Sequence, residues 1–101
     1  MVYVIAQLTI RDRDRYARYV AGFMDVLQRF GGRLLAADES PEVVEGRWGH
    51  DKVIVISFPD RASFDAWAGS DAYREISKDR IAATEGPVLV VRGVERADHP
   101  G

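Results

Sequence analysis

Two short segments of this chain are apolar at every position, and this feature limits the folds that it can adopt. They are residues 53–56 and 88–91, and residues 2–5 are nearly as apolar. A strand that is wet on one face alternates apolar and polar residues, so unbroken apolar runs indicate strands covered on both faces. The chain has 101 residues, a length that corresponds to one domain with a thin core. We expect one domain over residues 1–95 and a flexible tail over residues 96–101.

The first half of the chain predicts a strand, a helix and a second strand. Residues 2–10 are rich in β-branched side chains and lack Gly and Pro, which is typical of a strand. Asp12 or Asp14 can cap the helix that follows, and Gly31-Gly32 ends it. The residues that share one helical face by their spacing are Tyr16, Tyr19, Val20, Phe23, Leu27 and Phe30.

The second half predicts two further strands and a helical region. The second strand covers residues 33–37, is interrupted by Ser40-Pro41 and resumes over residues 43–48. Residues 49–51 then form a hairpin turn into a strand over residues 52–58. Asp60 and Ser70 cap two helical segments. Gly86-Pro87 breaks the helix, and residues 88–91 form the last strand.

This order of elements predicts an α+β, ferredoxin-like βαββαβ fold, with a four-stranded antiparallel sheet and two helices on one face. The helices cover only that face, and the chain has no further segment for the other one. A second copy of the chain is the simplest cover, because twofold dimers are the commonest assembly. We therefore expect a homodimer through the sheet face.

Composition excludes several classes of function. The chain has 14 basic and 16 acidic residues and a formal net charge of -2, so neither nucleic acid nor an acidic membrane is expected as a partner. It has no cysteine, which excludes thiol chemistry and fits a cytoplasmic location. No apolar run reaches the roughly 20 residues of a membrane span, and no signal peptide is expected.

No metal or cofactor is expected from the motifs. His50 in the predicted turn and His99 in the tail lack metal-binding spacing and are interpreted as solvated surface residues. No nucleophile motif or phosphate loop occurs, since Gly31-Gly32 follows a helix. A basic cluster lies at the start of the first helix and is interpreted as a solvated face in preference to an anion site. It consists of Arg11, Arg13, Arg15 and Arg18.

An ordered set of residues resembles a known family, the small proteins described as domain of unknown function 1330 within the dimeric α/β-barrel superfamily. The set runs through Asp12, Tyr19, Gly31-Gly32-Arg33, Glu45-Gly46, Trp48, Phe58-Pro59, Trp67, Ser70, Tyr73 and Arg80. The resemblance implies a homodimer whose two sheets pack face to face. It implies no common activity. Two positions depart from the family pattern: Ser57 stands where Glu is usual, and Ala68 stands where Tyr is usual.

Four residues are the candidate ligand-binding site: Tyr19, Trp67, Tyr73 and Arg80. Aromatic residues at helical spacing are usually core, yet these four could line a cleft between helices and sheet. The resemblance implies that such a cleft often holds an apolar or aromatic small molecule. Arg80 shares a face with Tyr73, and an arginine there either pairs with a carboxylate or binds an anionic ligand. A structural pair, with Glu45 as the candidate, is the preferred interpretation of Arg80.

Three functions remain open. The chain is a dimeric protein that binds a small aromatic or anionic molecule, a cofactor-free oxygenase or isomerase, or a structural or regulatory oligomer. An enzyme needs a positioned acid or base, and no carboxylate or histidine lies on a visibly apolar face. A binding protein needs only a cavity with a few polar groups, so we expect binding without catalysis.

Overall fold

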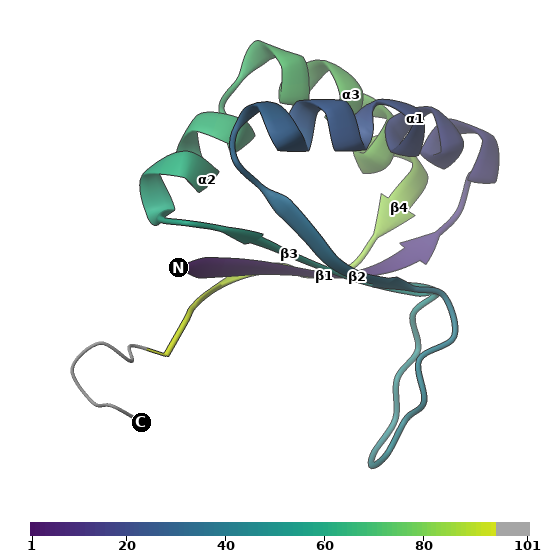
Figure 1. Cartoon of the computed structure of the whole chain (residues 1–101). Coiled ribbons are helices and arrows are strands. Elements are labelled where there is room, and N and C mark those ends of the chain that lie inside the picture. Colours follow the sequence, from purple (N-terminus) through teal and green to yellow (C-terminus); the bar gives the residue numbers. More distant parts are fainter. Residues whose placement is uncertain (95–101) are drawn as a thin grey trace.

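The computed structural model describes residues 1–94 and shows one antiparallel sheet with three helices on one side of it (Figure 1). The strands are β1 (Val2–Ile10), β2 (Arg33–Asp38), β3 (Lys52–Phe58), β4 (Thr84–Glu85) and β5 (Val88–Arg92). The helices are α1 (Arg13–Arg29), α2 (Arg61–Ala68) and α3 (Asp71–Ala83). The ferredoxin-like α+β prediction is confirmed, but the described residues form five strands in place of the expected four and three helices in place of two. The expected tail over residues 96–101, which includes His99, lies outside the described residues.

The sheet is open and has β1 near its centre. The strand order is β2-β3-β1, and β1 pairs on its other edge with β5 and, near its C-terminal end, with β4. Ile5 lies opposite Val55 of β3 and Leu89 of β5. Because residues directly opposite in an antiparallel ladder share a face, these three side chains lie on the same face of the sheet.

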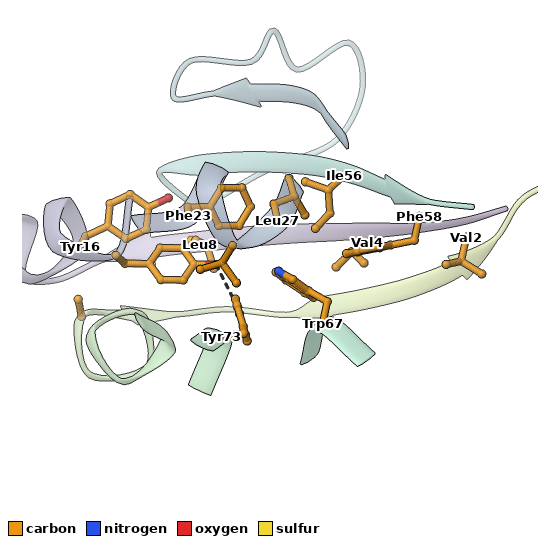
Figure 2. Packing of buried hydrophobic residues seen from close by; sticks show 13 residues of the cluster. Val2, Val4, Leu8, Tyr16, Phe23, Leu27, Ile56, Phe58, Trp67 and Tyr73 are labelled. Carbon is orange, nitrogen blue, oxygen red and sulfur yellow. Dashed lines mark hydrogen bonds between the residues drawn. The ribbon is translucent and has the colours of Figure 1, made fainter. Parts of the chain in front are cut away.

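The core lies between the helices and one face of the sheet (Figure 2). Alternate residues of β1 and β3 supply its floor, with Leu8 and Phe58 fully buried. The helices supply its roof: Tyr19 and Phe23 come from α1, and Trp67 from α2. No helix within residues 1–94 has the length and apolarity that crossing a membrane requires.

The first helix begins where the sequence predicts, and Asp12 is the cap. Its carboxylate accepts the backbone N–H of Arg15 at 3.1 Å. The buried face includes Tyr16, Tyr19, Phe23, Val26 and Leu27. The prediction for Val20 is wrong, because its side chain is 45% exposed. Val20 lines a shallow groove between α1 and β2, where the sheet ends and gives the helix no floor.

The two helical segments after β3 have the predicted caps. Asp60 accepts the N–H of Ser63 at 2.7 Å, and the Ser70 hydroxyl accepts the N–H of Tyr73 at 3.0 Å. The helix does not run to Gly86-Pro87, because Thr84 and Glu85 leave it and pair with Ile10 and Thr9 as β4. Gly86 has a φ of 133°, and a Cβ there would clash with the carbonyl oxygen of Gln7.

The prediction that residues 43–48 form a strand is wrong. β2 pairs directly with β3, and residues 39–51 form a long loop that extends beyond the sheet on the side away from the helices (Figure 1). Val44 is 84% exposed, so its β-branched side chain has no sheet to pack against. Residues 49–51 are not a hairpin turn either. Asp51 instead joins β1, with its N–H donating to the Leu8 carbonyl at 2.7 Å.

The face of the sheet away from the helices is also apolar. Its central residues are Ile5, Val55 and Leu89, with Val53 and Val91 beside them. Leu89 is 47% exposed and Val91 is 37% exposed. Single exposed apolar residues are ordinary, but a contiguous apolar face marks an interaction surface. We call this set of residues the open face.

Candidate functional site

A cavity of about 180 Å³ lies between the helices and the sheet. Its floor comes from alternate residues of β1, β3 and β5, and its roof from α1, α2 and α3. All four sequence-predicted site residues contribute to it. The lining consists of Val4, Ala6, Leu8, Tyr19, Phe23, Ile54, Ile56, Phe64, Trp67, Ala68, Tyr73, Arg80 and Val88.

The phenols of Tyr19 and Tyr73 join α1 to α3 across this cavity. Their hydroxyl oxygens are 3.0 Å apart, and their rings meet edge to face. Burial, and then the neighbouring Tyr73, raises the pKa of the Tyr19 phenol, while the guanidinium of Arg80 acts in the opposite direction. Tyr19 therefore stays protonated at neutral pH. One hydroxyl donates to the other, so the second keeps a proton free to donate.

Trp67 is held in place by aromatic neighbours, yet its polar atom has no partner. The indole is 4% exposed. It packs on Tyr73 with ring centroids 4.0 Å apart and on Phe58 at 5.2 Å. Its Nε1 is buried without a hydrogen-bond acceptor. Figure 2 shows this nitrogen pointing along the core toward Leu8, another lining residue.

Arg80 is the second lining residue with a buried, unpartnered donor. Its Nε has no hydrogen-bond acceptor, and its guanidinium makes no ion pair within residues 1–94. The prediction that Glu45 pairs with Arg80 is wrong. Glu45 is exposed on the loop beyond the open face, whereas Arg80 is on α3, so the sheet separates them.

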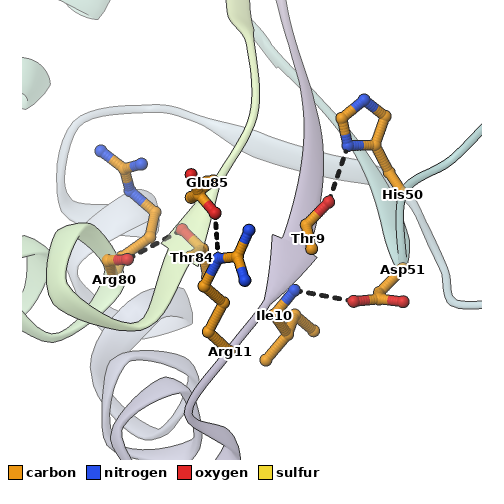
Figure 3. Close-up of polar contacts among 8 residues, drawn as sticks. All are labelled: Thr9, Ile10, Arg11, His50, Asp51, Arg80, Thr84 and Glu85. Carbon is orange, nitrogen blue, oxygen red and sulfur yellow. Dashed lines mark hydrogen bonds and ion pairs between the residues drawn. The ribbon is translucent and has the colours of Figure 1, made fainter.

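The carboxylates nearest to Arg80 in sequence are already paired with other basic residues. Glu75 pairs with Lys78 at 2.8 Å. Glu85 pairs with Arg11, and Asp79 pairs with Arg15 at 3.0 Å. Figure 3 shows the Arg80 guanidinium extending away from the Arg11–Glu85 pair, while the backbone carbonyl of Arg80 accepts the Thr84 hydroxyl at 2.8 Å. The backbone of Arg80 is thus fixed at the end of α3, and its side chain is left for the cavity.

The two departures from the family pattern lie on different faces. Ala68 lines the cavity, so the missing phenol leaves space there. Ser57 is buried, but it lies opposite Tyr3 in the ladder and therefore on the open-face side of β3. The absence of the family's usual Glu at this position therefore does not change the lining of the cavity.

The basic cluster at the start of α1 is engaged with carboxylates. Arg13 pairs with Glu39 at 3.0 Å, and Arg18 lies 3.7 Å from the Asp79 carboxylate that Arg15 also contacts. With Arg11 on Glu85, every member of the cluster has an acidic partner. These ion pairs agree with a solvated helix face.

A smaller polar cluster on the open-face side corrects the prediction for His50. His50 is not a freely solvated turn residue: it is half-buried, and its Nδ1 lies 3.0 Å from the Thr9 hydroxyl. Trp48 lies beside it; the Trp48 Nε1 donates to the Gln7 side chain at 3.0 Å, and its ring meets His50 edge to face. Residues 1–94 contain no group of three His, Asp or Glu side chains placed to hold a metal.

The sequence reasoning missed most of the apolar wall of the cavity. Phe23 and Phe64 line it from α1 and α2, and Ile54 and Val88 from the sheet. Phe23 was placed on the buried face of its helix by spacing alone. The alternation of residues along a strand predicts which side chains share one face of the sheet. It does not predict whether the space above that face is filled or is a cavity.

Comparisons with solved structures support the fold. RPA0582 of Rhodopseudomonas palustris, a protein of unknown function, has a TM-score of 0.79 and 20% identity, over 93% of this chain and 82% of that chain. SnoaB, a cofactor-independent oxygenase from Streptomyces nogalater, has a TM-score of 0.65 and 10% identity, over 93% of each chain. A dimeric ferredoxin-like protein of unknown function from Jannaschia sp. has a TM-score of 0.61 and 19% identity, over 92% of this chain and 98% of that chain.

The sequence itself gives the family. A comparison with curated proteins gave no match. The model of the family described as "Domain of unknown function (DUF1330)" matches residues 1–94, which is the whole of the described structure. These residues include the cavity, its four candidate site residues and the open face, so the chain belongs to the DUF1330 family.

Proposed function

We propose that this protein binds a small aromatic anion in the cavity between its helices and its sheet. The observation that carries the proposal is the pair of buried, unpartnered donors on the lining, Trp67 Nε1 and Arg80 Nε. A buried donor without an acceptor costs roughly 1–3 kcal/mol, and more when it belongs to a charged group. Two such donors beside one cavity are therefore best explained by a ligand that accepts from them.

The lining of the cavity favours a ligand that has both an aromatic ring and a negative charge. The wall is made of aliphatic and aromatic side chains, including Phe23, Phe64 and Trp67, which favour an apolar, flat molecule. Arg80 adds a positive charge without a counter-ion in the described part of the chain. A guanidinium in apolar surroundings binds carboxylates or enolates through charge-assisted hydrogen bonds.

Catalysis is the second candidate, because SnoaB shares the fold and because the Tyr19 and Tyr73 phenols beside Arg80 are donors that could stabilise an enolate oxygen. The cavity lacks a base, however. Its lining contains no carboxylate and no histidine, and Tyr19, with its raised pKa, is a poor proton acceptor at neutral pH. Binding therefore accounts for the residues better than catalysis does.

We also propose that the functional unit is a homodimer formed through the open face. Its apolar residues, centred on Ile5, Val55 and Leu89, form a contiguous surface without a cover from residues 1–94. The Jannaschia neighbour is described as dimeric. A stable dimer of this kind would bury on the order of 1,200 Å² or more in total. The cavity lies on the other side of the sheet and would remain accessible.

Tryptophan fluorescence, titrated with a panel of aromatic acids, tests the binding proposal. The protein has two tryptophans, and Trp48 lies on the open-face side, so Trp48→Phe makes Trp67 the sole reporter. We expect at least one acid to change the emission of this variant saturably. If every compound leaves the emission unchanged, and a crystal structure shows Tyr73 and Arg80 packed without a gap, the protein has no ligand site there. It is then a structural or regulatory oligomer.

A further inference from the structure

Building on the proposed function, we infer that the cavity selects a single aromatic ring with a carboxylate at one end and an uncharged hydrogen-bond acceptor at the other. The carboxylate would pair with Arg80, and the uncharged acceptor would receive the N–H of Trp67. A para-substituted benzoate is the simplest molecule of this class.

The two unpartnered donors lie toward opposite ends of the cavity. Trp67 packs on Phe58, which pairs with Val2 at the start of β1. Arg80 precedes Thr84, which pairs with Ile10 at the end of β1. Along α3, Tyr73 and Arg80 are two turns apart, about 10 Å of helix, and Trp67 stacks at the Tyr73 end. Because the backbones of Trp67 and Arg80 lie at opposite ends of the cavity, we take the ligand to carry two polar groups, one directed at each donor.

The chemistry of the donors decides what those groups are. An indole N–H and a guanidinium N–H can donate but cannot accept, so each needs an acceptor on the ligand. Arg80 is half-buried, whereas Trp67 is 4% exposed. The cavity is therefore better exposed to solvent at Arg80 than at Trp67. A negative charge on the ligand can pair with Arg80. The acceptor beside Trp67 must be neutral, because an unpaired buried charge is costly.

The size of the cavity limits the ligand to about one ring. An apolar cavity of about 150 Å³ holds benzene, and this one is about 180 Å³. The remaining volume is roughly one water molecule's share, so the ring and one small group fit inside while the carboxylate lies at the more exposed Arg80 end. Ala68 contributes to this space. A flat ring would lie among Phe23, Phe64 and Trp67, with the Tyr19–Tyr73 phenols along its edge.

A matched series of ligands tests this inference by isothermal titration calorimetry. The series is 4-nitrobenzoate, with an acceptor at the far end, 4-methylbenzoate, of similar shape without one, and 4-nitrotoluene, which lacks the carboxylate. We expect the nitro acid to bind about tenfold more tightly than the methyl acid, since it satisfies a buried donor, and 4-nitrotoluene to bind more weakly than the nitro acid. In Trp67→Phe, which keeps an aromatic ring but removes the N–H, the preference for nitro over methyl should disappear.

A second measurement uses only the wild-type protein, so it still tests the inference if Trp67→Phe fails to fold. In proton–nitrogen spectra of the wild-type protein, the indole N–H of Trp67 should shift downfield with 4-nitrobenzoate and not with 4-methylbenzoate. Equal affinities for the two acids, without an indole shift, would overturn the inference while leaving the binding of aromatic acids intact. If no compound in the series binds, the proposed function itself fails.

Discussion

At the scale of single residues, the polar atoms that lack partners are more informative than those that have them. The surface arginines on α1 all contact carboxylates, and exposed pairs of this kind contribute little to stability. Trp67 and Arg80 instead direct unpartnered donors at a cavity. The stability of the fold and the capacity to bind therefore depend on different atoms, and in Trp67 they depend on different parts of one side chain.

Replacement of Trp67 by alanine should cost roughly 3–5 kcal/mol of unfolding free energy, because a fully buried large aromatic side chain leaves a void that the core fills incompletely. Thermal and urea unfolding of the purified variant measure this loss. Trp48→Ala is the control, since Trp48 is half-buried and outside the core, and it should cost clearly less. A change at Trp67 within experimental error of zero would show that the indole does not pack in the core.

Tyr19 should make the protein less stable at high pH. Burial raises the pKa of its phenol above the ordinary value of 10.0, so the folded state holds a proton that the unfolded chain releases. The contribution of Tyr19 to the free energy of unfolding is complete below about pH 10 and falls as the pH rises further. Urea unfolding between about pH 8 and 11 should show a shallower decline for Tyr19→Phe than for the wild type. Identical slopes would show that Tyr19 ionises normally.

At the scale of elements, helix starts could be predicted and the path of the β2–β3 connection could not. Asp60 and Ser70 are local signals, because each side chain caps the turn directly after it. Val43 and Val44 favour strands by propensity, but a strand needs a neighbour to pair with, and that depends on tertiary structure. The split between α3 and β4 was missed for the same reason, since it arises from pairing with β1.

The cavity could be predicted in part. The spacing of Tyr73 and Arg80 along a helix indicates a shared face, and the structure places both on the cavity. The lack of a carboxylate partner for Arg80 could not be predicted, because it depends on where Glu45, Asp79 and Glu85 lie in space. Whether the seam between helices and sheet is filled depends on the sum of many side-chain volumes.

Ala68→Tyr should close the cavity and abolish the fluorescence response to aromatic acids. Ala68 lines the cavity from α2, and a phenol ring there would occupy the space of the ligand. Thermal unfolding checks that the variant folds, because overpacking commonly costs 1–3 kcal/mol. Ala66→Tyr, at an exposed position of the same helix, should keep the response. Unchanged binding in Ala68→Tyr would place the ligand elsewhere.

At the scale of the whole molecule, the sheet has two apolar faces with two different uses. The helices cover one face and leave a cavity there, while the open face is the proposed dimer interface. A charged residue on the open face should therefore disrupt assembly without affecting the core. Leu89→Arg should convert a dimer into a monomer in sedimentation at micromolar concentration, and Ile81→Arg, at a 65% exposed position on α3, should remain dimeric. A wild-type protein that sediments as a monomer would contradict the proposed dimer.

The binding of an aromatic acid to wild-type protein and to Arg80→Met, measured side by side by calorimetry, tests the central claim most directly. Methionine keeps the apolar volume and removes the unpartnered donor, so the variant should unfold at the same or a higher temperature. It should bind 4-nitrobenzoate at least about tenfold more weakly, because a charge-assisted hydrogen bond is lost. Equal affinity in the two proteins would contradict the claim that Arg80 binds the ligand. A loss of several kcal/mol of stability in Arg80→Met would also contradict it, because a loss of that size is typical of a broken structural ion pair.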